Sequence, residues 1–318
     1  MITAILLLPE WKRCAASPGV AEGVLAGWCA RGDHLPAVEP GDAMLRGLLD
    51  WPGNAMPVAA LSRQFDAGDA AGFAWLRADP AHIRADMSTA RMLACGELGL
   101  SPAECASIEA GLKPLFGDAG FEFEACRTDR WYVRAPSASD LPSAASPDEV
   151  IGDDLKLHFP TGPAGRRWRR LSNEAQIILH NHPVNAARAR RGAVGVNSLW
   201  FWGAGLLPDF VRAGVCGVLS PRAEIRALAA LAGVSSGPLE PATFEAALAS
   251  PAAESPRLVD LVDQRAQALE AGWLQPLQAA LRQRRVGRIE LRFASGERLR
   301  VKDSHRLRFW RRLRGLRS

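Results

Sequence analysis

Histidines are the first residues to test for chemistry in this chain, because they are the commonest metal ligands. The six histidines are scattered, and only His180 and His182 lie close together. Two residues that are two positions apart on a helix point about 200° away from each other, so this pair could share a metal only on a strand. The run His180-Asn181-His182 also spells an H-N-H nuclease signature, but no histidine follows it at metal spacing. We interpret it as a helix end with one buried and one exposed histidine, and we expect no metal site.

Nucleophile and phosphate-loop motifs do not occur in the sequence either. It contains no H-E-x-x-H, G-x-S-x-G, Walker or G-x-G-x-x-G motif. The six cysteines form no C-x-x-C pair, which favours reduced thiols in a cytoplasmic protein. The run Gly203-Ala204-Gly205 could bring backbone close to a phosphate, but a tight strand-to-loop turn is the favoured interpretation. We therefore expect no cofactor and name no catalytic residue.

Two groups of arginines are candidates for binding an anion. Arg77 and Asp79 follow a short apolar run, and Asn185 precedes Arg188 and Arg191. The guanidinium group matches the geometry of carboxylates and phosphates, so such groups suit small acidic ligands. Taken alone, each group is more typical of surface charge than of a site.

Positive charge is concentrated at the C-terminal end. From Arg282 to Ser318 there are 14 Arg and Lys against three acids, a net charge of +11, so the rest of the chain carries 5 − 11 = −6. Aromatic residues among the arginines are typical of a surface that binds nucleic acid or another acidic partner. The spacing of Leu307, Trp310 and Leu313 favours instead an amphipathic terminal helix that docks by its apolar face.

The elements that must position these residues alternate between helices and strands. Ile2–Leu8 is a continuous apolar run, typical of a strand buried on both faces of a parallel sheet and too short to cross a membrane. Further strands are predicted at Phe73–Leu76, Val196–Trp202 and Val215–Leu219, and hairpins at 121–133 and 289–301. Helices are predicted from Ser101 to about Leu112 behind a capping box with Glu104, over 171–182, over 185–191, after Ser220, and over 258–273. The pattern predicts an α/β fold with a mixed or parallel sheet flanked by helices.

Two segments resemble a known family. The segment Leu171–Leu206 resembles archaeal-type, cofactor-independent phosphoglycerate mutases, in which the corresponding stretch reads roughly h-P-V-N-x-x-R-x-x-x-G-x-x-x-A-N-x-x-W-L-W-G-x-G. The segment Phe73–Asp79, FAWLRAD, is similar to that family's strand ending in Arg-Cys-Asn. The matching positions are His182, Pro183, Val184, Asn185, Arg188, Gly192, Asn197, Trp200, Trp202, Gly203 and Gly205. The whole pattern also looks like the RpfE type of bacterial regulatory protein, a shortened and distant relative of the mutases.

The resemblance implies a reduced alkaline-phosphatase-like core with altered chemistry. Such mutases hold two metal ions with carboxylates and histidines, beginning with an Asp-Gly after the first strand, whereas Ile2–Leu8 here ends in Pro9-Glu10. Their serine nucleophile has Asp42 as its nearest counterpart, and their late Asp-x-x-G-His string does not occur after Gly205. Phosphoryl transfer in this superfamily needs the metals to hold the phosphate charge. We therefore expect no metal in the catalytic position.

The resemblance still predicts an anion pocket formed by Arg77, Asp79, Asn185, Arg188 and Arg191. It also predicts two parts of the chain, a core of 1–70 with 196–318 and an inserted α+β lobe of 71–195, with the pocket between them. The alternative is that Arg77 pairs with Asp79 and Arg188 faces water. The leading hypothesis is a non-catalytic, cytoplasmic regulatory or sensing protein that binds a small phosphorylated or carboxylated metabolite. An active phosphomutase or phosphoesterase with an altered site and a nucleic-acid-binding regulator remain the alternatives. No membrane partner is expected.

Overall fold

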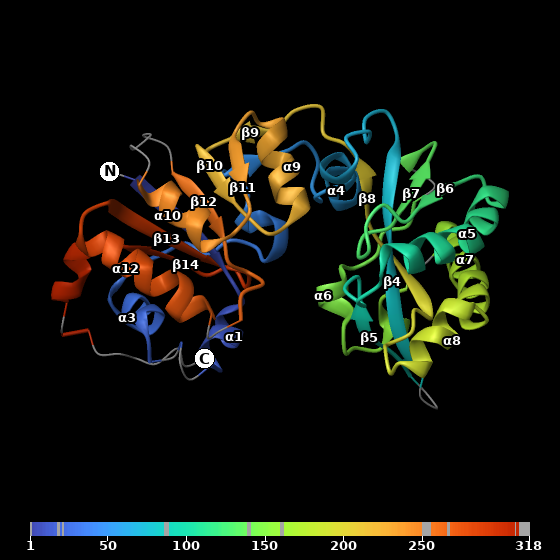
Figure 1. The fold of residues 1–318 in the computed structure, drawn as a ribbon. Coiled ribbons are helices and arrows are strands. Elements are labelled where there is room, and N and C mark those ends of the chain that lie inside the picture. The colour runs from blue at the N-terminus through green and yellow to red at the C-terminus, as the bar shows by residue number, and fades with distance from the viewer. Residues whose placement is uncertain are drawn as a thin grey trace. The chain divides into compact units, whose positions relative to one another are not determined.

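Two compact units make up the fold (Figure 1). Met1–Ala55 and Asp209–Ser318 form unit 1, and Met56–Pro208 forms unit 2. The computed structural model describes residues 2–17, 20, 22–85, 89–138, 141–159, 162–249, 256–265, 268–308 and 310–311. None of the helices in these ranges is long and apolar enough to cross a membrane.

Unit 1 is built on a mostly parallel sheet. Within the described residues it has seven strands in the order β11-β10-β12-β1-β13-β14-β2, and β14 and β2 are the antiparallel ones. The bounds are β1 Ile2–Leu8, β2 Asp33–Leu35, β10 Gly217–Leu219, β11 Ser235–Gly237, β12 Arg257–Asp260, β13 Val286–Phe293 and β14 Arg298–Val301. A separate pair joins β3 (Leu49–Asp50) to β9 (Arg212–Ala213). The apolar run of β1 pairs on both sides with parallel strands, as its sequence predicts.

Helices cover this sheet and bury its apolar side chains. They are α1 Trp11–Ala15, α3 Val24–Arg31, η1 Gly41–Met44, α9 Ala223–Leu231, α10 Pro241–Ala249, the π-helix η4 Leu269–Leu274, α12 Gln275–Arg282 and η5 Asp303–Leu307. Leu6 and Leu8 of β1 and Leu291 of β13 belong to one buried cluster with Trp28 of α3 and Leu277 of α12. Alternate residues of β1 therefore hold α3 and α12 against one face of the sheet.

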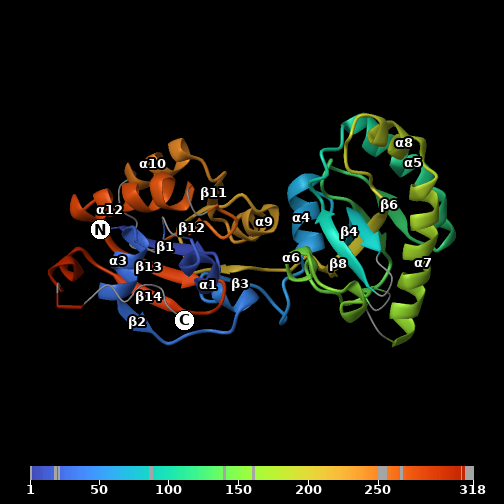
Figure 2. The ribbon, with the colours of Figure 1, turned by 90° about the horizontal axis from the view of Figure 1, so that it is seen from below.

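Unit 2 contains an antiparallel sheet whose long strand is β4 (Ala74–Ala85). Its partners are β5 (Ala90–Cys95), β7 (Tyr132–Ala135) and β8 (Ser198–Leu206), and β7 pairs in turn with β6 (Glu122–Glu124). The helices are α4 Val58–Asp66, α5 Pro102–Asp118, α6 Pro147–Val150, η3 Leu155–Leu157, α7 Gly162–His180 and α8 Pro183–Arg190. Leu76 packs in a cluster with α5 and α7, whereas Trp75 packs with Ala59 of α4. Figure 2 shows α4 and α7 on opposite sides of β4 and β8.

The predicted mixed α/β fold with helices on a mostly parallel sheet is confirmed. The capping box of Ser101 and Glu104 is present, although α5 continues past Leu112 to Asp118. Both predicted hairpins form, as β6–β7 and β13–β14. These elements are set by local signals, namely a cap, a turn and an alternating apolar pattern.

Two predictions are wrong, one about the pairing of a strand and one about a helix. The run Val196–Trp202 was expected in one sheet with Ile2–Leu8, but β8 pairs antiparallel with β4 in unit 2. The predicted helix over 258–273 is instead the inner strand β12 followed, after a turn, by η4. The structure also divides the chain at 55/56 and 208/209, because α4 and β8 pack on β4. The predicted lobe of 71–195 lacks both elements.

The described residues also contradict the docked terminal helix that was predicted from Leu307, Trp310 and Leu313. The side chains of Leu307 and Trp310 are 62% and 66% exposed. Leu313, Arg312, Arg314 and Arg317 lie outside the described residues. Polar contacts hold this segment, since Arg308 donates to Asp33 Oδ1 (2.6 Å) and Arg311 donates to the Gly32 carbonyl (3.0 Å).

Candidate functional site

Arg77 and Asp79 lie on one face of β4, as residues two apart on a strand must. The guanidinium donates in a fork to the carboxylate, with Nε–Oδ1 and Nη2–Oδ2 distances of 2.8 Å. Both residues are buried, Arg77 at 6% exposure and Asp79 at 2%. A ligand that used this fork of Arg77 would therefore have to displace Asp79.

Aromatic residues complete the surroundings of this pair. The indole of Trp202 donates to Asp79 Oδ2 (2.7 Å), and the Trp131 amide donates to Oδ1 (3.2 Å). The rings of Trp202 and Tyr132 lie 5.3 Å and 5.6 Å from the Arg77 guanidinium carbon. Burial raises the pKa of Asp79, and the opposing effect of Arg77 does not cancel it. Burial thus disfavours the charged form of Asp79 more than its hydrogen-bond partners favour it.

A second polar network, which the sequence did not indicate, surrounds Tyr132. Its hydroxyl donates to Asp66 Oδ2 (2.7 Å), and Arg130 donates to both oxygens of Asp66. Burial raises the pKa of Asp66, but the hydrogen bonds from Arg130 and Tyr132 outweigh it, so that this pKa lies below its usual range. Next to it, Arg63 donates to both oxygens of Asp69 and lines a hollow of about 410 Å³.

Asn185 joins three segments of unit 2. Its amide nitrogen donates to the carbonyls of Leu179 (2.7 Å) and Val196 (2.6 Å). Its amide oxygen accepts from the Val196 amide (2.8 Å). The end of α7, the start of α8 and the approach to β8 are thereby fixed together.

Arg188 is completely buried, at 0% exposure. It donates to the carbonyls of Val194 (2.7 Å), Gly99 (3.2 Å) and Leu98, and its Nη1 lies 3.2 Å from Glu104 Oε2. Arg191 donates to the other oxygen of Glu104 (2.7 Å) from a largely exposed position. The alternative in which Arg188 faces water is therefore wrong.

The five predicted anion-binding residues thus belong to two groups of contacts. Arg77 and Asp79 share one with Trp202, and Asn185, Arg188 and Arg191 belong to another around Glu104 and the carbonyls before β8. In both groups the guanidinium already has acidic or carbonyl acceptors. A pocket shared by Arg77 and Arg188 remains a prediction.

Two other candidates from the sequence, the pair His180 and His182 and the pair Gly203 and Gly205, serve the fold in the structure. His182 caps α8 by accepting from the Val184 amide (3.3 Å) and is half-buried, while His180 ends α7 exposed. Gly203 and Gly205 lie within β8, and a Cβ on Gly205 would lie 2.5 Å from the Cβ of Pro57. The close approach that these glycines permit is that of α4 and the residue before it.

Thiol nucleophiles are disfavoured by burial. Burial raises the pKa of Cys14 to about 11 and raises that of Cys95 still further. The thiolate is the reactive form of cysteine, so such thiols are poor nucleophiles near neutral pH.

Open α/β sheets bind ligands at the edge formed by the carboxyl ends of their strands, and the unit 1 sheet has such an edge. Asp260 ends β12 there, next to Leu7 of β1, and is fully buried. Its Oδ2 accepts from Ser220 Oγ (2.6 Å) and Arg222 Nε (2.8 Å), and its Oδ1 accepts from Arg222 Nη2 (3.1 Å). Sequence reasoning missed Asp260 because its segment was predicted to be a helix.

Comparisons with known proteins give partial matches. No family model matches the chain. It is 32% identical over 102 residues to a probable 2,3-bisphosphoglycerate-independent phosphoglycerate mutase of Geobacter sulfurreducens, covering 30% of this chain and 26% of that protein. It is 30% identical over 66 residues to 2,3-bisphosphoglycerate-independent phosphoglycerate mutase of Methanothrix thermoacetophila, covering 21% of this chain and 17% of that protein. Part of this chain is similar to phosphoglycerate mutases. The matches thus span about a quarter or less of each curated relative.

The fold has a solved counterpart. The PH0037 protein from Pyrococcus horikoshii superposes with a TM-score of 0.52 at 12% identity, over 94% of this chain and 87% of that one. This likeness concerns the fold alone. The sequence matches are what support the predicted homology to cofactor-independent phosphoglycerate mutases.

The residues at the carboxyl edge do not fit the metal pair that this resemblance implies. Glu10 is exposed beyond the end of β1, and both oxygens of Asp260 accept from Arg222. Among the described residues, no three His, Cys, Asp or Glu side chains gather as metal ligands. A guanidinium lies where a cation would have to approach Asp260, and like charges repel.

Proposed function

We propose that this chain is a non-catalytic regulatory or sensing protein of the bacterial cytoplasm, similar to the RpfE type, that binds a small phosphorylated or carboxylated metabolite. The observation that carries the proposal is the ion pair between Arg222 and Asp260 at the carboxyl edge of the parallel sheet. Catalysis of phosphoryl transfer by two metals requires free carboxylate and imidazole ligands around the phosphate. Here the buried carboxylate is already neutralised by an arginine.

Two further observations support this proposal. The sequence has Pro9-Glu10 after β1, where the mutases that it resembles have Asp-Gly. The arginines that the resemblance places on substrate, Arg77 and Arg188, have carboxylate partners of their own. Function depends on the site and not on the fold, so a mutase-like fold can serve binding once its site residues pair with one another.

The experiment combines metal analysis with an activity assay. Purified chain is assayed for conversion between 3- and 2-phosphoglycerate with added Mn²⁺, beside an active archaeal-type mutase, and its metal content is measured. We expect no turnover and no pair of tightly bound ions. Any activity found belongs to this chain only if Asp260→Asn abolishes it while Asp153→Asn, at an exposed carboxylate of unit 2, preserves it. That result would establish the active phosphomutase or phosphoesterase instead.

A further inference from the structure

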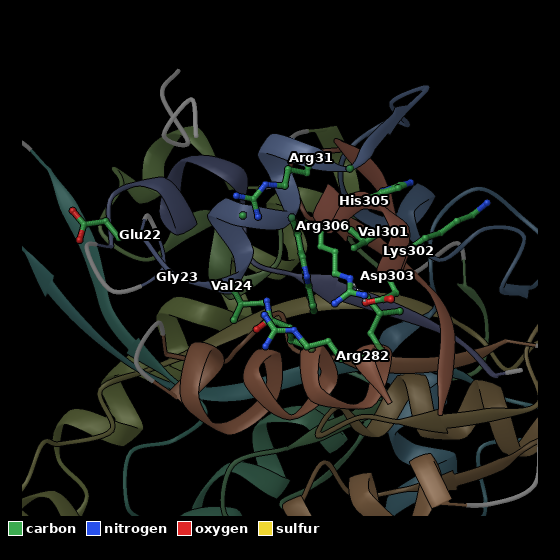
Figure 3. Close-up of a pocket in the computed structure, with 15 residues that line it drawn as sticks. Glu22, Gly23, Val24, Arg31, Arg282, Val301, Lys302, Asp303, His305 and Arg306 are labelled. Atoms are coloured by element: carbon green, nitrogen blue, oxygen red, sulfur yellow. Dashed lines mark ion pairs between the residues drawn. The ribbon is translucent and has the colours of Figure 1, made fainter. Parts of the chain in front are cut away.

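A pocket of about 330 Å³ lies in unit 1 between α3, α12 and the segment that follows β14. Figure 3 shows its lining residues. Pockets of about this size and above hold small molecules in many proteins. The five residues of the predicted anion pocket (Arg77, Asp79, Asn185, Arg188 and Arg191) do not line it, whereas Arg282, Lys302 and Arg306 belong to the basic C-terminal end.

Positive charge predominates in this pocket. Arg31, Arg282, Lys302 and Arg306 line it together with only two carboxylates, Glu22 and Asp303. Asp303 is paired with Arg306 (3.5 Å), and Figure 3 shows the Glu22 side chain extending outward. Within the described part of the chain, Arg31 and Arg282 have no carboxylate partner. Their charges remain available to an anion.

Two buried nitrogen atoms of the lining also lack hydrogen-bond partners among the described residues. They are Nε of Arg31 and Nδ1 of His305. His305 is 4% exposed, and its other ring nitrogen lies 3.4 Å from Asp33 Oδ2. Buried polar atoms are nearly always satisfied in folded proteins, so Arg31 and His305 of the lining each keep hydrogen-bonding capacity that the fold does not use.

A glycine of α3 borders the open space of this pocket. A Cβ on Gly27 would meet nothing within 4 Å. Glycine is a poor residue inside a helix, so its presence here favours open space over helix stability. Trp28, Leu281 and Val301 add an apolar wall. The site therefore combines guanidinium groups with apolar surface, which suits an organic molecule that carries a phosphate.

The pocket lies away from the carboxyl edge of the sheet. Val301 pairs with Ile289, which pairs with Ala4 near the start of β1, whereas Asp260 pairs with Leu7 near its end. The site is therefore separate from the edge that carries Asp260 and Arg222.

We propose that this pocket binds the phosphate group of a small phosphorylated molecule through Arg31 and Arg282. The inference deepens the proposed function by giving the ligand a place, and it rests on that function only for the class of ligand. A phosphate seated between the two arginines accepts charge-assisted hydrogen bonds from both, and the organic part contacts Trp28 and the space over Gly27.

The test is calorimetric titration of the full chain with inorganic pyrophosphate and with adenosine monophosphate. Arg282→Ala should weaken binding about tenfold or more, because one charge-assisted hydrogen bond is lost. Gly27→Leu should block the pocket while keeping or raising the melting temperature, since leucine is the better helix former. The control Arg170→Ala removes the same charge from an 83% exposed site in unit 2 and should leave binding unchanged.

Several results would overturn the inference. They are no binding of either probe, equal weakening by Arg170→Ala, or full binding by Gly27→Leu. Binding of a DNA oligonucleotide with strong salt dependence, without binding of the two probes, would favour nucleic acid instead. These binding measurements need no turnover, so they test the pocket separately from the activity assay. The pocket can fail to bind phosphate although the chain proves inactive and metal-free, and it can bind phosphate although the chain proves active.

Discussion

Arg188 shows how an arginine that suits an anion can serve the fold instead. Its guanidinium is always charged, yet the side chain is fully buried. Three backbone carbonyls and Glu104 accept from it, and Glu104 also closes the capping box at the start of α5. One side chain thus connects the start of α5, the loop before it and the segment before β8.

Replacing Arg188 should therefore destabilise the protein severely. We expect Arg188→Ala to lower the free energy of unfolding by about 3–5 kcal/mol, because it leaves buried acceptors without a partner. Urea denaturation measures this. Arg191→Ala removes an exposed partner of the same carboxylate and should cost less than about 1 kcal/mol. Equal costs, or unchanged stability with loss of phosphate binding, would return Arg188 to the predicted anion pocket.

The residue types of this region were predictable, but their burial was not. Asn185, Arg188 and Arg77 stand out in the sequence because amide and guanidinium groups bind anions. The acceptors that bury Arg188 include the Gly99 carbonyl, 89 positions away in the chain. Local patterns carry no information about such a partner, so the sequence could not distinguish a ligand site from an internal ion pair.

Elements followed the sequence where their signals were local. Ser101 and Glu104 start α5, and the pattern around Ser295-Gly296 gives the hairpin of β13 and β14. The segment from Leu258 was read as a helix because its apolar spacing also fits a helical face. Short apolar runs are ambiguous in this way, and only pairing with β1 and β10 makes Arg257–Asp260 a strand. The pairing partner of Val196–Trp202 was equally ambiguous, so this run was wrongly predicted in one sheet with Ile2–Leu8.

The packing at Gly205 of β8 gives a test at this level. Gly205→Ala should lower the free energy of unfolding by about 1–3 kcal/mol, because the new Cβ would lie 2.5 Å from the Cβ of Pro57. Chemical denaturation followed by tryptophan fluorescence would measure it. The matched control is Gly117→Ala in α5, where a Cβ meets nothing within 4 Å and should stabilise the helix slightly. A harmless Gly205→Ala would mean that no close approach exists.

The two units differ in how the chain builds them. Unit 2 is one continuous segment, whereas unit 1 needs both ends of the chain, since β1 lies between β12 and β13. Each has its own buried cluster. A continuous segment with its own core is expected to fold independently.

This division predicts the behaviour of fragments. A fragment of residues 56–208 should unfold cooperatively in a thermal melt followed by circular dichroism. The shorter fragment 71–195, which matches the division predicted from the sequence, should not, because it lacks α4 and all of β8. If the shorter fragment folded equally well, the pairing of β8 with β4 would be dispensable.

The edges of the unit 1 sheet bear on how the protein behaves at high concentration. The outermost strands, β11 and β2, have three residues each. Beside β2, Arg308 and Arg311 donate to the carbonyls of Arg31 and Gly32. A long bare edge recruits strands from other molecules and seeds aggregation, whereas short edges flanked by arginines do not. We therefore expect Arg308 and Arg311 to protect this edge against ordered self-association, so that replacing both with alanine should increase fibril formation.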